Sequence, residues 1–227
     1  MNVTRVRPNV WHIEESYRVY CTLVTGRSRA VLWDTGMGRK NLRELVREIT
    51  SLPCLVLCSH GHADHTGGNA LFDAAALSRE DWPLLTPPQP PIRDLRAGER
   101  LDLGGEQAAA VPLAGHTRGS MGLLLERERL LLAGDALGPN LMLAEDGLSP
   151  AETLRSLSAA AQLPFDEYLT SHAPLPQPRA QLDFLLCHLA NLPDPAAAPC
   201  RGGELMHSTM TDGKRRSVIL YKQKGNA

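Results

Sequence analysis

Hydrophobic positions in the first half of the chain alternate between two periodicities. Runs rich in β-branched and aromatic residues predict three successive strands, at residues 9–15, 18–26 and 30–36. Residues 41–49 instead place their apolar side chains at helical spacing. The fully apolar run 54–58 then predicts a buried strand.

The second half repeats this alternation. Three further strands are predicted at residues 107–115, 121–128 and 129–135, the last two joined by a tight charged turn. The helix predicted over 149–163 starts with Ser149, Pro150 and Glu152, a capping box with proline at the first helical position. A short strand, an amphipathic helix and a hairpin around an Asp-Gly turn follow, at residues 167–173, 179–192 and 205–222.

Two segments break the pattern. Residues 84–95 hold four prolines, which predicts an irregular surface crossing, and residues 192–203 have the composition of a linker. Because strands and helices are mixed and no linker divides the chain midway, we expect one α/β domain over residues 1–227.

Composition and charge narrow the function classes. Hydrophobic residues make up 43% of the 227 residues and charged residues 22%, as in ordinary globular proteins. The net charge of -1 and the single short basic run at 213–217 argue against nucleic-acid binding. No apolar stretch approaches the length of a membrane span. Without a secretory signal, and with five irregularly spaced cysteines, the chain is expected to be cytoplasmic.

Metal-ligand side chains gather directly after the apolar run 54–58. His60, His62, Asp64 and His65 stand close together, among small residues that let the backbone fold around one point. Imidazole and carboxylate groups are good ligands for zinc and similar ions. The alternative is a polar loop with solvated histidines, but so many ligands in so short a segment favour a metal site.

The same sequence pattern occurs at three later points where a predicted strand meets a loop. His116, Asp135 and His172 each follow an apolar strand and a small residue. Taken singly, each would be read as a cap or turn residue. Because strand ends are where open α/β sheets usually place their sites, together they predict one composite site with the histidine-rich segment.

These residues resemble the motifs of the metallo-β-lactamase-fold hydrolases, of the glyoxalase II-like or lactonase-like kind without a C-terminal substrate domain. The motifs are H-x-H-x-D-H from His60 to His65, "GHTRGS" at 115–120, "AGD" ending at Asp135, "SH" ending at His172 and "DTG" starting at Asp34. The resemblance implies an αββα sandwich of mixed sheets, with helices on the outer faces and two metal ions at one edge.

The resemblance also implies a role for each residue. His60, His62 and His116 would hold one ion, Asp64, His65 and His172 the second, and Asp135 would bridge the two. Asp34 would orient ligands from outside the ligand set, as metal sites require. The two divalent ions would be zinc, with iron or manganese also suited to such ligands.

This site predicts a metal-dependent hydrolase. Bound metal lowers the pKa of a bridging water, so that hydroxide forms near neutral pH and attacks a carbonyl or phosphoryl centre. Asp64 is the expected catalytic proton acceptor. No G-x-S-x-G motif supplies a separate nucleophile. We therefore expect hydrolysis of a small ester, thioester or lactone.

Other functions stay open. A phosphodiesterase of the same superfamily would use the same ions, but nucleases of this kind carry an accessory domain and a basic surface, neither of which the sequence shows. A glutathione-binding domain would need more than the 55 residues after His172. A metal-dependent sensor or binding protein and a di-iron redox protein are further alternatives, although flavin-linked di-iron relatives carry glutamate where His62 stands.

The residues that would contact the substrate are less well defined by the sequence, and the oligomeric state is not predicted. Arg118 would either reach an anionic substrate or face solvent, and Tyr17 or Tyr20 would contribute to the pocket. Trp82, Leu84 and Leu85 are candidate pocket walls, with the core as the alternative. Cys54 and Cys58 are expected in the core, His12 in an N-terminal strand and His188 in a structural position, and His207 is unassigned.

Overall fold

The computed structural model describes residues 1–143, 147–192 and 205–222. Their strands form three sheets, which we call sheets A, B and C. Sheet A runs in the order β1-β2-β3-β4-β5-β6-β7. Its strands are β1 (Asn2–Arg7), β2 (Val10–Ser16), β3 (Val19–Thr25), β4 (Ala30–Trp33), β5 (Cys54–Leu57), β6 (Ala75–Leu77) and β7 (Ile92–Asp94). Strands β1 to β4 are antiparallel neighbours, whereas β4 to β7 are parallel.

Sheet B has the order β14-β13-β11-β10-β9-β8. Its strands are β8 (Arg100–Asp102), β9 (Gln107–Pro112), β10 (Met121–Leu125), β11 (Leu130–Leu132), β13 (Glu167–Leu169) and β14 (Gln177–Pro178). Trp33 and Leu57 of sheet A pack against Leu123 and Leu132 of sheet B in one buried cluster. Burial of these apolar side chains between the sheets holds the sandwich together.

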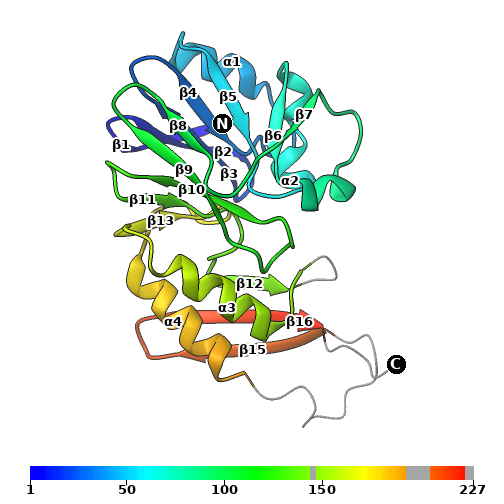
Figure 1. Cartoon of the computed structure of the whole chain (residues 1–227), viewed down its shortest axis with the longest axis vertical. Helices are drawn as coiled ribbons and strands as arrows, with labels where there is room; N and C mark the ends of the chain where they lie inside the picture. Colours follow the sequence, from blue (N-terminus) through cyan, green and yellow to red (C-terminus); the bar gives the residue numbers. More distant parts are fainter. Residues whose placement is uncertain (144–146, 193–204, 223–227) are drawn as a thin grey trace.

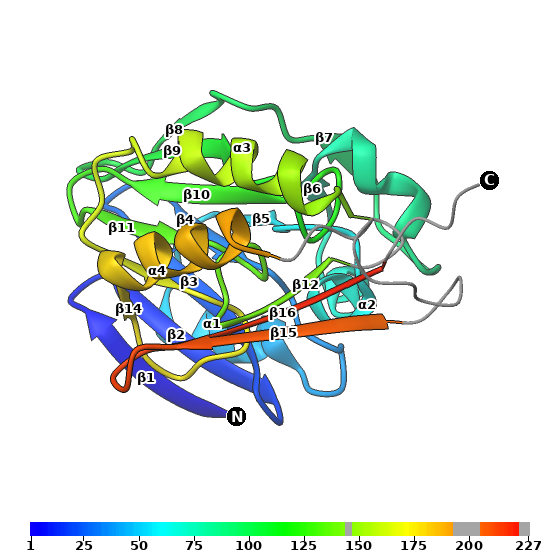
Figure 2. The same cartoon turned by 90° about the horizontal axis from the view of Figure 1, so that it is seen from below.

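Helices cover both outer faces of the sandwich (Figure 1). Helix α1 (Leu42–Ile49) places Leu42 and Val46 against sheet A. Helices α3 (Pro150–Ala160) and α4 (Arg179–Ala190) pack on sheet B and lie side by side (Figure 2). The predicted fold, an α/β sandwich of mixed sheets with helices on its outer faces, is confirmed.

A third sheet extends this arrangement. Sheet C has the order β12-β16-β15, from β12 (Asn140–Leu143), β15 (Leu205–Thr211) and β16 (Arg216–Lys222). Ile219 of β16 shares a buried cluster with Leu157 of α3 and Leu185 of α4. The predicted hairpin is therefore present, and it covers the helices of sheet B.

Local signals placed several element boundaries correctly. The Ser149 side chain accepts a hydrogen bond from the Glu152 N–H, and the Glu152 carboxylate accepts one from the Ser149 N–H, as the capping box predicts. Strands β10 and β11 pair across the predicted charged turn. The helix predicted over 179–192 ends at Ala190.

Other predictions need correction. The crossing over 84–95 is irregular only in its proline-rich part, because Ile92–Asp94 forms β7 and pairs with β6. The exposed edge strand β1 was missed, since its residues show no buried face. The linker at 192–203 lies outside the described residues except for Leu192, and the single domain over 1–227 stays a prediction.

Within the described ranges, none of the helices has the length and apolar character needed to cross a membrane.

Candidate metal centre

The predicted ligands stand at the ends of four strands and converge. The loop after β5 carries His60 and His62 and continues into the short helix α2 (Ala63–Thr66). The other ligands follow β9, β11 and β13. Their side chains form three overlapping groups that could hold a metal ion: His60, His62 and His116; His60, His65 and Asp135; and Asp64, His65 and His172.

The first group, here called the three-histidine cluster, consists of His60, His62 and His116. His62 Nδ1 lies 3.1 Å from both His60 Nε2 and His116 Nε2. Behind it, His116 Nδ1 donates to the Met142 carbonyl at 2.7 Å, and His60 Nδ1 contacts Ser59 Oγ at 2.9 Å. Because a carbonyl only accepts, His116 carries its proton on Nδ1 and turns the Nε2 lone pair toward the other two rings.

The third group, here called the carboxylate cluster, consists of Asp64, His65 and His172. Asp64 Oδ2 lies 3.4 Å from His172 Nε2 and 3.5 Å from His65 Nε2. His172 Nδ1 donates to the Arg18 carbonyl at 2.7 Å, and His65 Nδ1 donates to Asp34 Oδ2 at 2.9 Å. With the Nδ1 proton fixed in this way, each ring would direct an Nε2 lone pair toward the carboxylate once Nε2 gives up its own proton.

Asp135 lies between the two clusters. Its Oδ2 is 3.1 Å from His172 Nε2, 3.5 Å from His65 Nε2 and 3.7 Å from His116 Nε2. One carboxylate thus reaches ligands of both clusters, which is the position that a bridging ligand requires.

The electrostatics of the site call for added positive charge. The Asp135 and Asp64 carboxylates raise the pKa of His172 to about 10. Burial alone would lower the pKa of His65, but Asp135 and Asp34 raise it well above its usual value. In the three-histidine cluster, burial lowers the pKa of His60 and keeps that ring neutral. The carboxylates therefore draw positive charge to their side of the site, and a divalent cation would supply it.

The spacing of the donors fits metal ions. Two ligands bound tetrahedrally to one zinc ion at about 2.0–2.1 Å lie roughly 3.3 Å apart. The distances between facing atoms here run from 3.1 to 3.7 Å. In addition, His65 Nε2 and Asp135 Oδ1 are buried without a hydrogen-bond partner. Imidazole nitrogens and carboxylate oxygens at such distances could hold divalent cations.

Asp34 connects the carboxylate cluster to the surrounding core. It is fully buried at the end of β4 and has a positive φ of 63°. Its oxygens accept from His65 Nδ1, from the N–H and hydroxyl of Ser59, and from the Ser171 hydroxyl. This contact with His65 is the one that the predicted ligand-orienting role needs, and the role itself stays a prediction.

Three supporting groups were missed by the sequence analysis. The carbonyls of Arg18 and Met142 hold two ligand histidines, but a backbone oxygen has no signal in residue type. The third is Asp81, a buried aspartate whose contacts are described below. Its position in a polar turn gave no reason to single it out.

The predicted substrate residues lie in different environments. Arg118 is exposed and forms no side-chain hydrogen bond or ion pair with the residues that the structure describes. Tyr17 is 88% exposed in the turn that precedes Arg18, whereas Tyr20 is buried and stacks on His12 with 4.6 Å between ring centroids. These positions leave Arg118 and Tyr17 as the accessible candidates.

The candidate pocket walls are mainly part of the core. Trp82 and Leu85 pack against the buried cluster under α1, as the core alternative predicted. Leu84 lies closer to the histidine-rich loop, because a side chain at Gly61 would come within 2.8 Å of its Cβ.

The remaining histidines and cysteines have structural contacts. His12 bridges Thr22 Oγ1 and the Ala173 carbonyl, and His188 bridges the hydroxyls of Ser217 and Ser208. Cys58 is fully buried, and Cys54 packs at the edge of the same cluster. The side chain of His207 lies outside what the structure describes.

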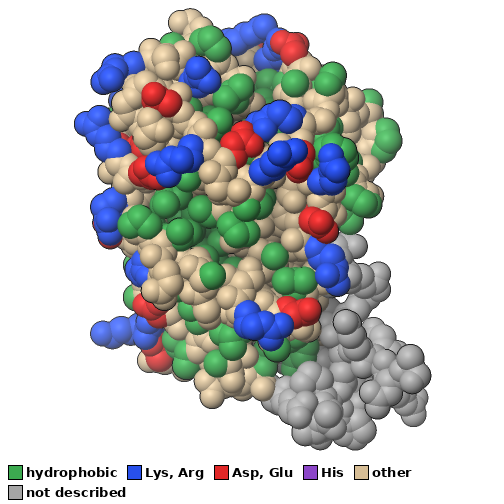
Figure 3. All heavy atoms as spheres, in the orientation of Figure 1, with side chains coloured by type: hydrophobic (Ala, Val, Ile, Leu, Met, Phe, Trp, Pro, Cys, Tyr) green, Lys and Arg blue, Asp and Glu red, His purple; other side chains and the backbone are tan. Residues whose placement is uncertain are grey.

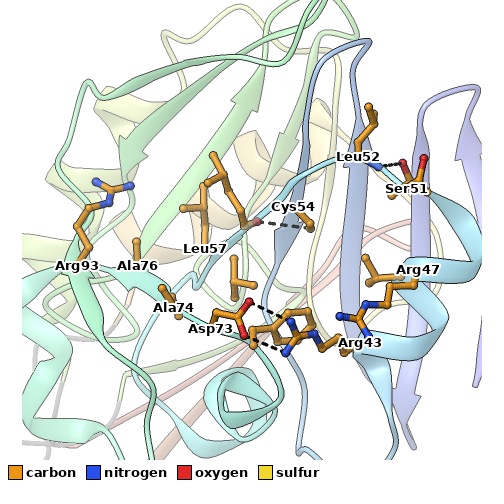
Figure 4. Close-up of a pocket in the computed structure, with 16 residues that line it drawn as sticks. Arg43, Arg47, Ser51, Leu52, Cys54, Leu57, Asp73, Ala74, Ala76 and Arg93 are labelled. Carbon is orange, nitrogen blue, oxygen red and sulfur yellow. Dashed lines mark hydrogen bonds and ion pairs between the residues drawn. The ribbon is translucent and has the colours of Figure 1, made fainter.

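A separate hollow of about 520 Å³ opens near the start of β5, at the end opposite to the histidine loop. Figure 4 shows its charged rim, where Arg43 donates to both oxygens of Asp73. Arg93, also on the rim, is paired with Glu99. No side chain of the three ligand groups lines this hollow.

Comparison with known proteins supports the class of the site. The family model described as metallo-beta-lactamase superfamily matches residues 17–77 and 75–172. The chain belongs to this superfamily. A metallo-beta-lactamase from Pontibacter korlensis has the same fold, with a TM-score of 0.71 and 21% identity over 84% of this chain and 99% of that one.

Two curated relatives are hydrolases by name. The acyl-coenzyme A thioesterase MBLAC2 of Gallus gallus is 29% identical over 164 residues, which cover 55% of this chain and 59% of the relative. A hydroxyacylglutathione hydrolase of Fuscovulum blasticum is 32% identical over 122 residues, or 51% of this chain and 46% of the relative. The matched part thus spans about half to three fifths of either relative.

Proposed function

We propose that this protein hydrolyses small acyl thioesters with two divalent ions, of which zinc is the first candidate. The observation that carries the proposal is Asp135, whose Oδ2 lies within 3.7 Å of ligand nitrogens from both clusters. A single carboxylate in that position fits a site in which two ions share one bridge. Iron or manganese would suit the same donors.

Ions held there would polarise the acyl carbonyl and activate water. The chain's own residues prepare the site for this reaction. The Met142 and Arg18 carbonyls fix the ring orientation of His116 and His172. Asp64 is partly exposed, so its carboxylate can accept a proton at the open side of the site.

Thioesters are the substrates that the relatives favour. Both relatives named above act on acyl groups carried by a thiol compound, coenzyme A or glutathione. Two exposed apolar side chains belong to segments that adjoin the ligands, which supports an acyl substrate. Met142, whose carbonyl holds His116, is 44% exposed, and Leu175, three residues after His172, is 59% exposed. These side chains would contact the acyl group of a substrate.

The charge of the protein surface argues against the alternative of a phosphodiesterase that cleaves nucleic acids. On the face shown in Figure 3, Lys and Arg side chains are interspersed with Asp and Glu. The net charge of -1 agrees with a small-molecule substrate. We keep cytoplasmic localisation as part of the proposal.

The test is a substrate panel with the zinc-loaded protein. Short-chain acyl thioesters, the matching oxygen esters, lactones and a bis-aryl phosphodiester are compared by kcat/KM. We expect the thioesters to be cleaved most efficiently. Preferential cleavage of the phosphodiester would mean that phosphodiesters, and not thioesters, are the substrate class. A metal-loaded protein that cleaves none of these compounds would favour the alternative of a metal-dependent sensor or binding protein.

Arg118 gives a prediction about substrate charge. Since its guanidinium is exposed two positions after His116, we expect it to contact an anionic group on the thiol part of the substrate. Arg118→Ala should raise KM for anionic thioesters about two- to fivefold, the value of one exposed ion pair, and leave kcat nearly unchanged. Neutral thioesters of the same acyl group should be unaffected.

Arg100→Ala is the matched control, because Arg100 is an exposed arginine on the edge strand β8. Equal effects of Arg118→Ala on neutral and anionic substrates would show that this arginine only faces solvent.

A further inference from the structure

Asp81 ties together the two loops that carry the three-histidine cluster. It lies in the 3₁₀ segment Arg79–Leu84 and is 1% exposed. Its Oδ2 accepts from the Gly61 N–H at 3.0 Å and from the Thr117 hydroxyl at 2.6 Å. Its Oδ1 accepts from the Gly119 N–H at 2.8 Å. One buried carboxylate thus has three donors from two loops.

These donors stand next to the ligands in the chain. Gly61 is the residue between His60 and His62, and Thr117 directly follows His116. The Thr117 hydroxyl also contacts Ser120 Oγ at 2.7 Å, which closes the second loop on itself. The carboxylate therefore sets the separation of the backbones on which the three histidines stand.

The backbone has adapted to this close approach. A side chain at Gly119 would come within 2.5 Å of Asp81 Oδ1, and one at Gly61 within 2.5 Å of the Asp81 carbonyl oxygen. Only glycine fits at either position without displacing Asp81. Two glycines and a buried carboxylate in contact indicate a junction that depends on this geometry.

We propose that Asp81 is the positioning residue of the three-histidine cluster, and that it sets the metal affinity of that cluster selectively. Its side-chain hydrogen bonds go to two backbone N–H groups and the Thr117 hydroxyl and to none of the ligand side chains, so it would act through the loop backbones. Asp34 serves the other side of the site, where it accepts directly from His65. Asp34 also reaches His60 indirectly, through the Ser59 hydroxyl, whereas the side-chain hydrogen bonds of Asp81 all go to the two loops of the three-histidine cluster. This inference rests on the proposed metal-dependent function.

The test measures zinc affinity by competition with a chromophoric chelator, without any substrate. Asp81→Asn keeps the shape of the side chain but turns one acceptor oxygen into an NH₂ group, which would face an N–H or hydroxyl donor. Each metal cluster is isolated by removing a ligand of the other one. His172→Ala leaves the three-histidine cluster complete, and His62→Ala leaves the carboxylate cluster complete.

In the His172→Ala background, Asp81→Asn should lower zinc affinity about 10- to 100-fold, as expected for groups that support ligands. In the His62→Ala background it should change the affinity less than about threefold, because the supported cluster is already broken. Asp73→Asn, an exposed aspartate paired with Arg43, is the control and should change neither value. Circular dichroism of the metal-free variants checks the fold.

If Asp81→Asn does not fold, Thr117→Val replaces it, since this change removes the hydroxyl that contacts Asp81 and Ser120 and keeps the carboxylate. It should lower affinity several-fold in the His172→Ala background alone. Equal losses in both backgrounds, or no loss in either, would overturn the inference. A chain that binds zinc as expected but cleaves no thioester would refute the proposed function and leave this inference standing, whereas a wild-type chain that binds no zinc would overturn both.

Discussion

Asp135→Ala is expected to lower thioester hydrolysis at least about a hundredfold while the protein stays folded. Groups that merely support ligands change metal affinity or activity 10- to 100-fold, and Asp135 contacts ligands of both clusters directly. Its removal takes away the negative charge that both ions would share. The site would then lose the bridge that sets the distance between the ions, which is the geometry that the reaction needs.

The measurement compares kcat/KM of the variant and the wild type on the best thioester of the panel, both loaded with zinc. Asp166→Ala is the control, because Asp166 is an exposed aspartate paired with Arg129. Circular dichroism confirms that both variants are folded. A well-folded Asp135→Ala protein with near-normal rates would mean that Asp135 is a turn residue after β11.

Removal of metal is expected to abolish hydrolysis and to lower thermal stability. Without cations, carboxylates and histidine nitrogens face each other at 3.1–3.7 Å, and the buried His65 Nε2 and Asp135 Oδ1 have no hydrogen-bond partner. Ions that bind only the folded chain stabilise it in proportion to the logarithm of their concentration over Kd. The protein should therefore show a higher Tm with zinc than after treatment with a chelator.

Titration of the metal-free protein with zinc gives the number of ions. Activity and Tm should rise together and saturate at about two equivalents, because the donors form two clusters joined by one carboxylate. Saturation of both at one equivalent would refute the two-ion proposal. A protein whose activity and Tm do not change on chelation would show that the histidine centre holds no metal.

Sequence patterns were sufficient for the features that depend on near neighbours. The apolar periodicities predicted most of the strands of both large sheets, and the capping box placed the start of α3 at Pro150. The histidine-rich segment could be read as a site because its ligands are close in the chain and of unmistakable type. His116, Asp135 and His172 were added by their shared place after apolar strands, and the structure brings all of them together.

The sequence by itself therefore determined the fold class and the set of side chains that meet at the site. Only the tertiary structure decided what holds them there. The Arg18 and Met142 carbonyls orient two histidines, and any residue type would supply such an oxygen. The pairing of β12 with β16 joins segments about 80 residues apart. Asp81 can support the three-histidine cluster only because two loops that are distant in the chain donate hydrogen bonds to it. These contacts depend on how the packed sheets and loops meet, which local residue patterns do not encode.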